Sequence, residues 1–130
     1  MKKLLFLIFI TSSLTSCSCQ KAITEINQKL DSKTTKEIVL VRLINDSRCP
    51  ENVQCIWAGE VTFEVAAYDN GNLMEQKQFI LKPTNQDEVI AWLSKHLPKT
   101  KTPLQSIAVV PYPKDGVSVK LEEYTLKLNY

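Results

Sequence analysis

The chain has 130 residues, 44% of them hydrophobic and 23% charged, which fits one domain that buries roughly two-thirds of its unfolded surface. The formal net charge is +2, and Lys2 and Lys3 account for all of it. The remaining charges balance, and no basic stripe is interleaved with aromatic residues, so the composition argues against nucleic-acid binding.

The first 16 residues have the architecture of a secretory signal peptide. Two lysines precede an apolar run over residues 4–10, and small polar residues follow it. The run is too short to span a membrane as a helix. The segment Leu14-Thr15-Ser16-Cys17 resembles the bacterial lipoprotein box, which implies that Cys17 receives lipid such as palmitate. Cys19 is a rival, but Ser16 precedes it where the box favours an apolar residue like Leu14.

A lipid on Cys17 implies attachment to a bilayer, since each buried methylene contributes about 0.8 kcal/mol. Ser18 follows the lipid cysteine in place of the aspartate that directs retention at the inner membrane, which favours the outer membrane of the bacterial cell envelope. This compartment is oxidising, so Cys49 and Cys55 are the natural disulfide pair. Cys19 is expected to stay unpaired in the tether.

Residues 17–36 are predicted to form a lipidated tether. The segment is polar, and Ile23, Ile26 and Leu30 recur at helical spacing. Residues 31–36 have no apolar side chain to bury. We therefore expect a flexible tether with some helix, followed by a domain over residues 37–130.

The next three elements read as a β-meander. Residues 38–44 are mostly apolar and predict a buried strand. Residues 60–67 alternate between apolar and other side chains, which predicts a strand with one wet face. Asn70-Gly71 favours a tight hairpin turn, because such turns need positive φ angles. Residues 74–81 are then the returning strand.

Residues 86–96 are predicted to form a short helix. Asn85 with Glu88 resembles a capping box. One helical face gathers apolar side chains, and Pro98 ends the pattern; the face consists of Val89, Ile90, Leu93 and Leu97. Trp92 is expected to pack in the core or at its rim.

The C-terminal third is predicted to contain three strands. They cover residues 104–110, 117–121 and 124–130, and the proline-rich segment 111–116 forms a turn between the first two. Six strands with short turns and one helix near 86–96 predict an all-β domain, a small antiparallel β-sandwich or an open barrel.

Cys49 and Cys55 enclose a polar loop that admits several interpretations. A disulfide would close a short ring and contribute about 2 kcal/mol at best, so its expected role is local. Trp57 would then cover the disulfide and close one end of the sandwich. A thiol redox site would need Cys-x-x-Cys at a helix start. A metal site would need three or four ligands, and His96 is the only histidine.

A recognition role is the remaining interpretation of this loop. Polar side chains on a rigid loop form a candidate contact surface, since functional residues concentrate on loops held by scaffolds. The candidate contact residues are Arg48, Glu51, Asn52 and Gln54.

The same block carries a family resemblance. The run Arg48-Cys49-Pro50, followed by Cys55, Trp57, Ala58 and Gly59, resembles an Arg-Cys-Pro-x4-Cys-x-Trp-Ala-Gly core shared by small uncharacterised bacterial lipoproteins. Their later Val-x-Pro-Tyr-Pro turn and closing Tyr-x-Leu-x-Leu strand are matched by residues 109–113 and 124–128. The resemblance covers most of residues 37–130 and implies a lipoprotein location, but no activity.

The expected function is therefore that of a non-enzymatic, lipid-anchored binding module. Its partner would be an envelope protein or an envelope polymer. The alternative is a structural accessory lipoprotein without a soluble ligand. Ser94, His96 and Asp87 suggest a hydrolase triad, but Ser94 and His96 lie two apart on a helix and point away from each other. We expect no catalytic residue, metal site or cofactor.

Overall fold

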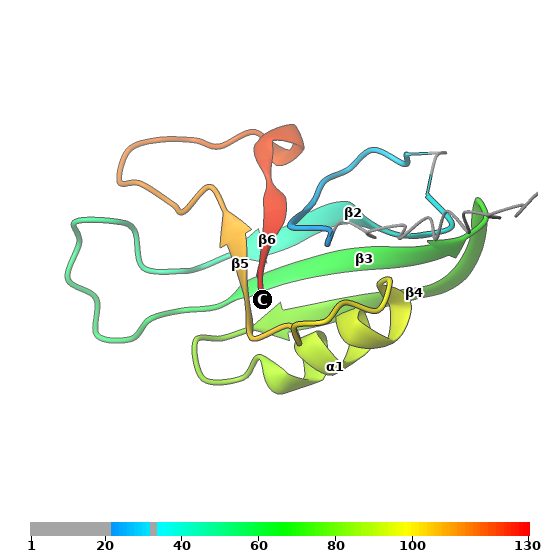
Figure 1. The fold of residues 1–130 in the computed structure, drawn as a ribbon. Coiled ribbons are helices and arrows are strands. Elements are labelled where there is room, and N and C mark those ends of the chain that lie inside the picture. The colour runs from blue at the N-terminus through cyan, green and yellow to red at the C-terminus, as the bar shows by residue number, and fades with distance from the viewer. Residues whose placement is uncertain (1–21, 32–33) are drawn as a thin grey trace, which may run out of the picture.

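Two antiparallel three-stranded sheets and one helix make up the part of the chain that the computed structural model describes, residues 22–31 and 34–130 (Figure 1). The first sheet has the order β2-β3-β4, with strands Lys36–Asp46, Val61–Asp69 and Asn72–Leu81. The second has the order β1-β6-β5, with strands Glu25–Ile26, Thr125–Asn129 and Ser106–Val110. Helix α1 spans Asp87–His96, and a 3₁₀ turn, η1, spans Leu121–Glu123. The predicted small all-β fold with one short helix is confirmed.

The inner face of the first sheet builds the core. Alternate residues of the central strand β3 are buried there, as the period of two predicts; they are Val61, Phe63, Val65 and Ala67. The expectation of a wet outer face for β3 is only partly correct, because Thr62 and Ala66 are also buried. Both are short side chains on a strand with a neighbour on each side.

The turn between β3 and β4 is the predicted tight hairpin. Asn70 has φ 49° and Gly71 has φ 79°, so two consecutive residues adopt the left-handed region that an Asn-Gly pair favours. The turn fixes the pairing of Asp69 with Asn72, and the register of the two strands shifts once between Tyr68 and Ala67.

The Glu75 carboxylate on β4 contacts three side chains of helix α1. Trp92 Nε1 donates to Glu75 Oε1 at 2.9 Å, and Lys95 Nζ and His96 Nε2 lie 3.2 and 2.9 Å from Glu75 Oε2. Hydrogen bonds from Trp92, Lys95 and His96 lower the pKa of Glu75 to about 2. Trp92 also packs edge-on against Phe79 in the core, as expected.

The predicted capping box at the start of α1 is wrong. The N-cap residue is Gln86, and no side chain caps the helix. Gln86 Oε1 instead accepts a hydrogen bond from the backbone N–H of Ile107 at 3.1 Å. The side chain therefore joins the helix start to strand β5.

The described part of the predicted tether belongs to the folded domain. Residues 25–26 form strand β1 beside β6, and Ile26 is buried in the core. Leu40 N–H donates to Asn27 C=O at 2.8 Å, which joins this segment to the first sheet. The helical spacing of the apolar residues here produces no helix. The predicted signal peptide, Cys17 and Cys19 lie outside the described residues.

The strand predicted over residues 117–121 is also wrong. Val117 and Leu121 are exposed, and the segment runs as a loop into η1. Alternating apolar residues form a strand only where a partner strand is available. The sixth strand of the fold is β1, which was not predicted. In residues 22–31 and 34–130, no helix combines the length and apolar character that crossing a membrane requires.

Candidate functional site

Residues 47–60, which we name the stapled loop, extend the β2–β3 hairpin beyond the first sheet. Ser47 N–H donates to Glu60 C=O at 2.9 Å, and Cys49 N–H donates to Ala58 C=O at 3.0 Å. The predicted Cys49–Cys55 disulfide is present, with the two Cα atoms 5.9 Å apart. In Figure 1 the loop projects from the end of the sheet opposite the Asn-Gly turn.

Gly59 allows the two arms of this loop to approach closely. Its φ is +74°, and a Cβ atom placed there would lie 2.0 Å from Ser47 O and 2.8 Å from Arg48 Cα. No side chain fits, so the glycine of the Trp-Ala-Gly run has a backbone role.

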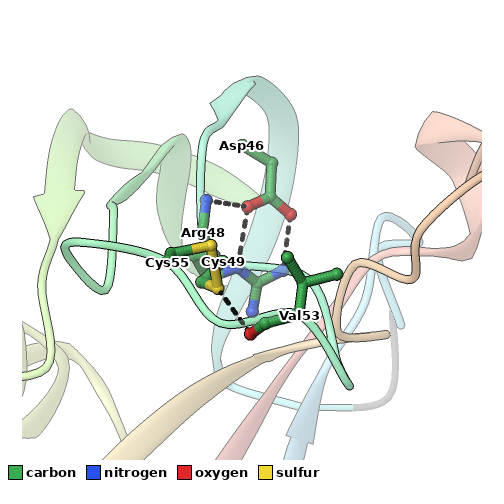
Figure 2. Close-up of a disulfide and its surroundings, with 5 residues drawn as sticks. All are labelled: Asp46, Arg48, Cys49, Val53 and Cys55. Carbon is green, nitrogen blue, oxygen red and sulfur yellow. Dashed lines mark hydrogen bonds and ion pairs between the residues drawn. A yellow bond between two sulfur atoms is a disulfide. The ribbon is translucent and has the colours of Figure 1, made fainter.

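The side chain of Arg48, at the start of the stapled loop, is buried and only 9% exposed. Its Nε and Nη2 donate to the Asp46 carboxylate at 2.8 and 2.5 Å, a bidentate pair visible in Figure 2. Nη1 donates to Val109 C=O at 2.5 Å, and Nη2 also donates to Pro111 C=O at 3.1 Å. The guanidinium group lies 4.6 Å from the centre of the Tyr112 ring.

This network sets the protonation state of Asp46. Burial raises the pKa of Asp46, but the hydrogen bonds and charge of Arg48 outweigh it, so the pKa lies below the ordinary value of 3.8. Tyr124 Oη lies 3.4 Å from the same carboxylate. Burial and the charge of Asp46 raise the pKa of Tyr124. The carboxylate is therefore ionised at neutral pH and matches the buried cation.

A second connection holds the outer part of the loop. Glu51 N–H donates to Pro113 C=O at 2.9 Å, and Lys114 Nζ lies 3.9 Å from the Glu51 carboxylate. Beside the disulfide, Cys49 Sγ lies 3.2 Å from Val53 O (Figure 2). The stapled loop is thus fixed by the hairpin ladder, the disulfide, Arg48 and the turn at residues 111–114.

The end of the stapled loop is apolar and exposed. Ile56 is 98% exposed and Trp57 is 77% exposed, and Val53, inside the disulfide ring, is half-exposed. We name Val53, Ile56 and Trp57 the apolar tip. The expectation that Trp57 closes one end of the sandwich is wrong, because Trp57 is mostly exposed and lines an open cleft beside residues 82–84.

The predicted contact residues separate into two groups. Glu51, Asn52 and Gln54 are exposed on the stapled loop, where contact is feasible. Asn52 adopts φ 65°, a left-handed conformation that asparagine tolerates. Arg48 is not available for contact, because its donors are used by Asp46, Val109 and Pro111.

Two neighbouring clefts lie at the base of the loop. The larger, of about 470 Å³, runs between residues 57–60 and residues 82–84. The smaller, of about 230 Å³, reaches strand β5 and shares Ala58, Lys82 and Pro83 with the first. Neither cleft could be predicted from the sequence, because the residues that form its walls are far apart in the chain.

The side chains of the suggested hydrolase triad on α1 have surroundings that differ from one another. His96 contacts Glu75 on β4, and α1 carries Ser94 as an exposed residue. Within residues 22–31 and 34–130, no three His, Cys, Asp or Glu side chains are grouped so as to hold a metal ion.

Comparison with known proteins finds no matching family model, no matching curated protein and no matching solved structure. The candidate site is therefore defined by its own geometry: a rigid loop that presents an apolar tip.

Proposed function

We propose that this protein is a non-enzymatic binding module, attached to the bacterial cell envelope by lipid on Cys17, that recognises a partner protein through the apolar tip. The observation that carries the proposal is the almost complete exposure of Ile56 and Trp57 on a fixed loop. Single exposed apolar residues are ordinary, but Ile56 and Trp57 are almost fully and mostly exposed, respectively, on a loop that a disulfide holds in place.

The energetics favour contact at this tip. Tryptophan is the residue type most enriched among those that dominate binding energy in interfaces. A loop already ordered by a disulfide and by Arg48 loses little conformational entropy on association. The polar residues Glu51, Asn52 and Gln54 are exposed on the same loop as the tip and could supply the polar contacts that border an apolar interface. An envelope polymer, or a structural role without a ligand, are the alternatives that the following experiments distinguish.

The double substitution of Ile56 and Trp57 by serine is expected to abolish partner capture, with at least a tenfold loss of recovered protein. Because both side chains are exposed, the free energy of unfolding of the variant should differ from that of wild type by about 0.5 kcal/mol or less. The measurement is affinity capture from cross-linked membranes with the Cys17→Ala chain as bait, followed by thermal denaturation of each bait.

The matched control replaces Leu73 and Met74 by serine. These are also adjacent exposed apolar residues, on β4 and remote from the stapled loop. Capture should be retained in this control. Equal recovery of partner protein by wild type and the Ile56/Trp57 variant would refute binding through the apolar tip. Recovery of glycan without protein would indicate that the partner is an envelope polymer.

The lipid attachment makes a separate prediction. Cys17→Ala removes the acyl acceptor, so the protein should move from the membrane pellet to the soluble fraction. Cys19→Ala is the matched control, because it lies two residues away and should leave the protein in the pellet. Membrane fractionation with metabolic labelling by a palmitate analogue checks both. A labelled, membrane-bound Cys17→Ala protein would contradict the assignment.

A further inference from the structure

Strand β4 is an outer strand of the first sheet and pairs only with β3 among the described residues. The direction of the peptide groups on β3 is known at both of its ends. Asn70 N–H donates to Thr35 C=O at 2.6 Å, and Glu60 C=O accepts from Ser47 N–H at 2.9 Å, both on the side of β2. Because peptide groups alternate along a strand, the even-numbered residues of β3 bond to β2 and the odd-numbered residues bond to β4.

The same alternation gives β4 a free row of hydrogen-bonding groups. Lys77 and Phe79 lie opposite odd-numbered residues of β3 and bond to them. Gln76, Gln78 and Ile80 therefore direct their N–H and C=O away from β3. All three residues are exposed, Ile80 to 48%, and in the part of the chain that the structure describes their outward groups have no partner. We name the outward N–H and C=O groups of Gln76, Gln78 and Ile80 the open edge.

Helix α1 contacts β4 on the inner face, beside the open edge. Its Trp92 donates to Glu75 and packs against Phe79, and its Glu88 lies 2.9 Å from Lys77 Nζ. These β4 residues alternate with those of the open edge, so their side chains point to the opposite face of the sheet. The helix therefore does not occupy the face on which the side chains of the open edge lie.

The other outer strands carry features that prevent pairing. Strand β2 has two register shifts, and its Leu40 N–H already donates to Asn27 C=O. On β5, Ile107 and Val109 are only 3% and 1% exposed, and β1 has two residues. Bulges, coverage and short length are the usual protections of a sheet edge. Residues 75–81 of β4 have none of them.

We propose that two copies of this protein associate through the open edge, with their β4 strands antiparallel and Gln78 on the two-fold axis. In this alignment Gln78 faces Gln78 of the partner subunit, and Gln76 faces Ile80 of the partner subunit. Each outward N–H and C=O of the open edge then bonds to the open edge of the other copy. The two first sheets become one continuous sheet of six strands.

The sequence of β4 favours this alignment over its neighbours. Lys77 faces Phe79 of the partner subunit, and Glu75 faces Leu81 of the partner subunit, so no like charges lie opposite each other. An axis on Lys77 would place the two Lys77 side chains opposite each other, which destabilises a strand pair. An axis on Gln76 or on Phe79 would pair fewer residues of the open edge with one another. The open edge is thus complementary to itself, and a second copy is its occupant.

Cysteine cross-linking tests the alignment in the intact chain carrying Cys17→Ala and Cys19→Ala, whose other cysteines form the disulfide of the stapled loop. Gln78→Cys places two sulfur atoms across the axis, where Cα atoms about 5.5 Å apart suit a disulfide. Oxidation with copper phenanthroline should give a covalent dimer on a non-reducing gel. Gln76→Cys is the matched control, because its two copies would lie at least about 13 Å apart along the ladder and should stay monomeric.

Sedimentation equilibrium tests the association itself, with the Cys17→Ala/Cys19→Ala chain as the reference. This chain should show a reversible monomer–dimer equilibrium. Gln78→Pro removes one outward N–H from each copy, so the dissociation constant should rise about thirtyfold. A proline whose nitrogen faces the free side of an edge strand is compatible with the sheet, and thermal denaturation checks that the variant folds.

The association is independent of the proposed function, because the apolar tip is not part of the open edge. The Ile56/Trp57 serine variant should therefore dimerise as the reference chain does, so failure of the tip and failure of the edge are separable. A monomer at millimolar concentration, or equal cross-linking of the Gln78→Cys and Gln76→Cys chains, would overturn the proposal. A dissociation constant unchanged in folded Gln78→Pro would also overturn it.

Discussion

Arg48→Ala is expected to lower the free energy of unfolding by about 3–5 kcal/mol, the cost of removing one partner from a buried ion pair. The substitution leaves the Asp46 carboxylate, whose side chain is 8% exposed, without its counter-ion. It also removes the donor to Val109 C=O and the second contact at Pro111 C=O. Chemical denaturation at neutral pH measures the loss.

Arg42→Ala is the matched control for this prediction. Arg42 Nε lies 2.6 Å from the Glu64 carboxylate, but its side chain is 63% exposed. An exposed pair of this kind contributes about 1 kcal/mol or less. Arg48→Lys keeps the charge without the planar fork of donors, so its effect should be intermediate. Equal losses in Arg42→Ala and Arg48→Ala would show that burial of the pair adds nothing.

The contribution of this pair should depend on pH with a defined sign. Because the pKa of Asp46 is lowered in the folded protein, the stabilisation is complete above the ordinary value of 3.8 and declines as the pH falls through the folded value. The difference in free energy of unfolding between wild type and Arg48→Ala should therefore become smaller as the pH falls through the pKa that Asp46 has in the folded protein.

The sequence was most informative where structure is local. Strand β3 follows from alternation, β2 from its apolar run and β4 from the Asn-Gly turn, since these signals lie within one meander. Helix α1 follows from its apolar periodicity. The Cys49–Cys55 bridge follows from spacing and compartment, because both residues lie in one short loop.

Contacts between distant segments explain the errors in the fold. Strand β1 has only two residues, and its partner in β6 is about a hundred positions away. Ile26 is buried in the core and Ile23 packs against it, although no helix forms in this segment. Residues 117–121 show the opposite error. They have the alternating pattern of a strand, but no neighbouring strand pairs with them among the described residues.

Contacts between distant segments also explain why the candidate site was predicted only in part. The sequence around Arg48 is typical of an exposed loop. Its carbonyl acceptors belong to Val109 and Pro111, which are 61 and 63 positions later in the chain. One local signal existed, since Asp46 and Arg48 are two residues apart and share a face of an extended chain. The prediction that Trp57 covers the disulfide and closes one end of the sandwich rests on its size and on its position beside Cys55. Its exposure depends on the length of the hairpin, which no single residue type encodes.

Gly59→Ala is expected to destabilise the protein by about 3 kcal/mol and to disorganise the stapled loop. Left-handed backbone costs an alanine about 1–2 kcal/mol. The new Cβ would also lie 2.0 Å from Ser47 O, so the two arms of the loop must separate. Separation breaks the hydrogen bonds from Ser47 N–H and Cys49 N–H, at about 1 kcal/mol each.

Gly71→Ala separates these two causes. Gly71 has φ +79°, close to the value at Gly59, but a Cβ there meets nothing within 4 Å. This control should cost only the conformational penalty of about 1–2 kcal/mol and leave the loop intact. The excess loss in Gly59→Ala then measures the close approach of the two arms, and denaturation of both variants provides it. Capture by the apolar tip should fall in Gly59→Ala and persist in Gly71→Ala, because only the first alters the support of Trp57. Equal destabilisation with capture retained in both would mean that the tip does not depend on the narrow hairpin.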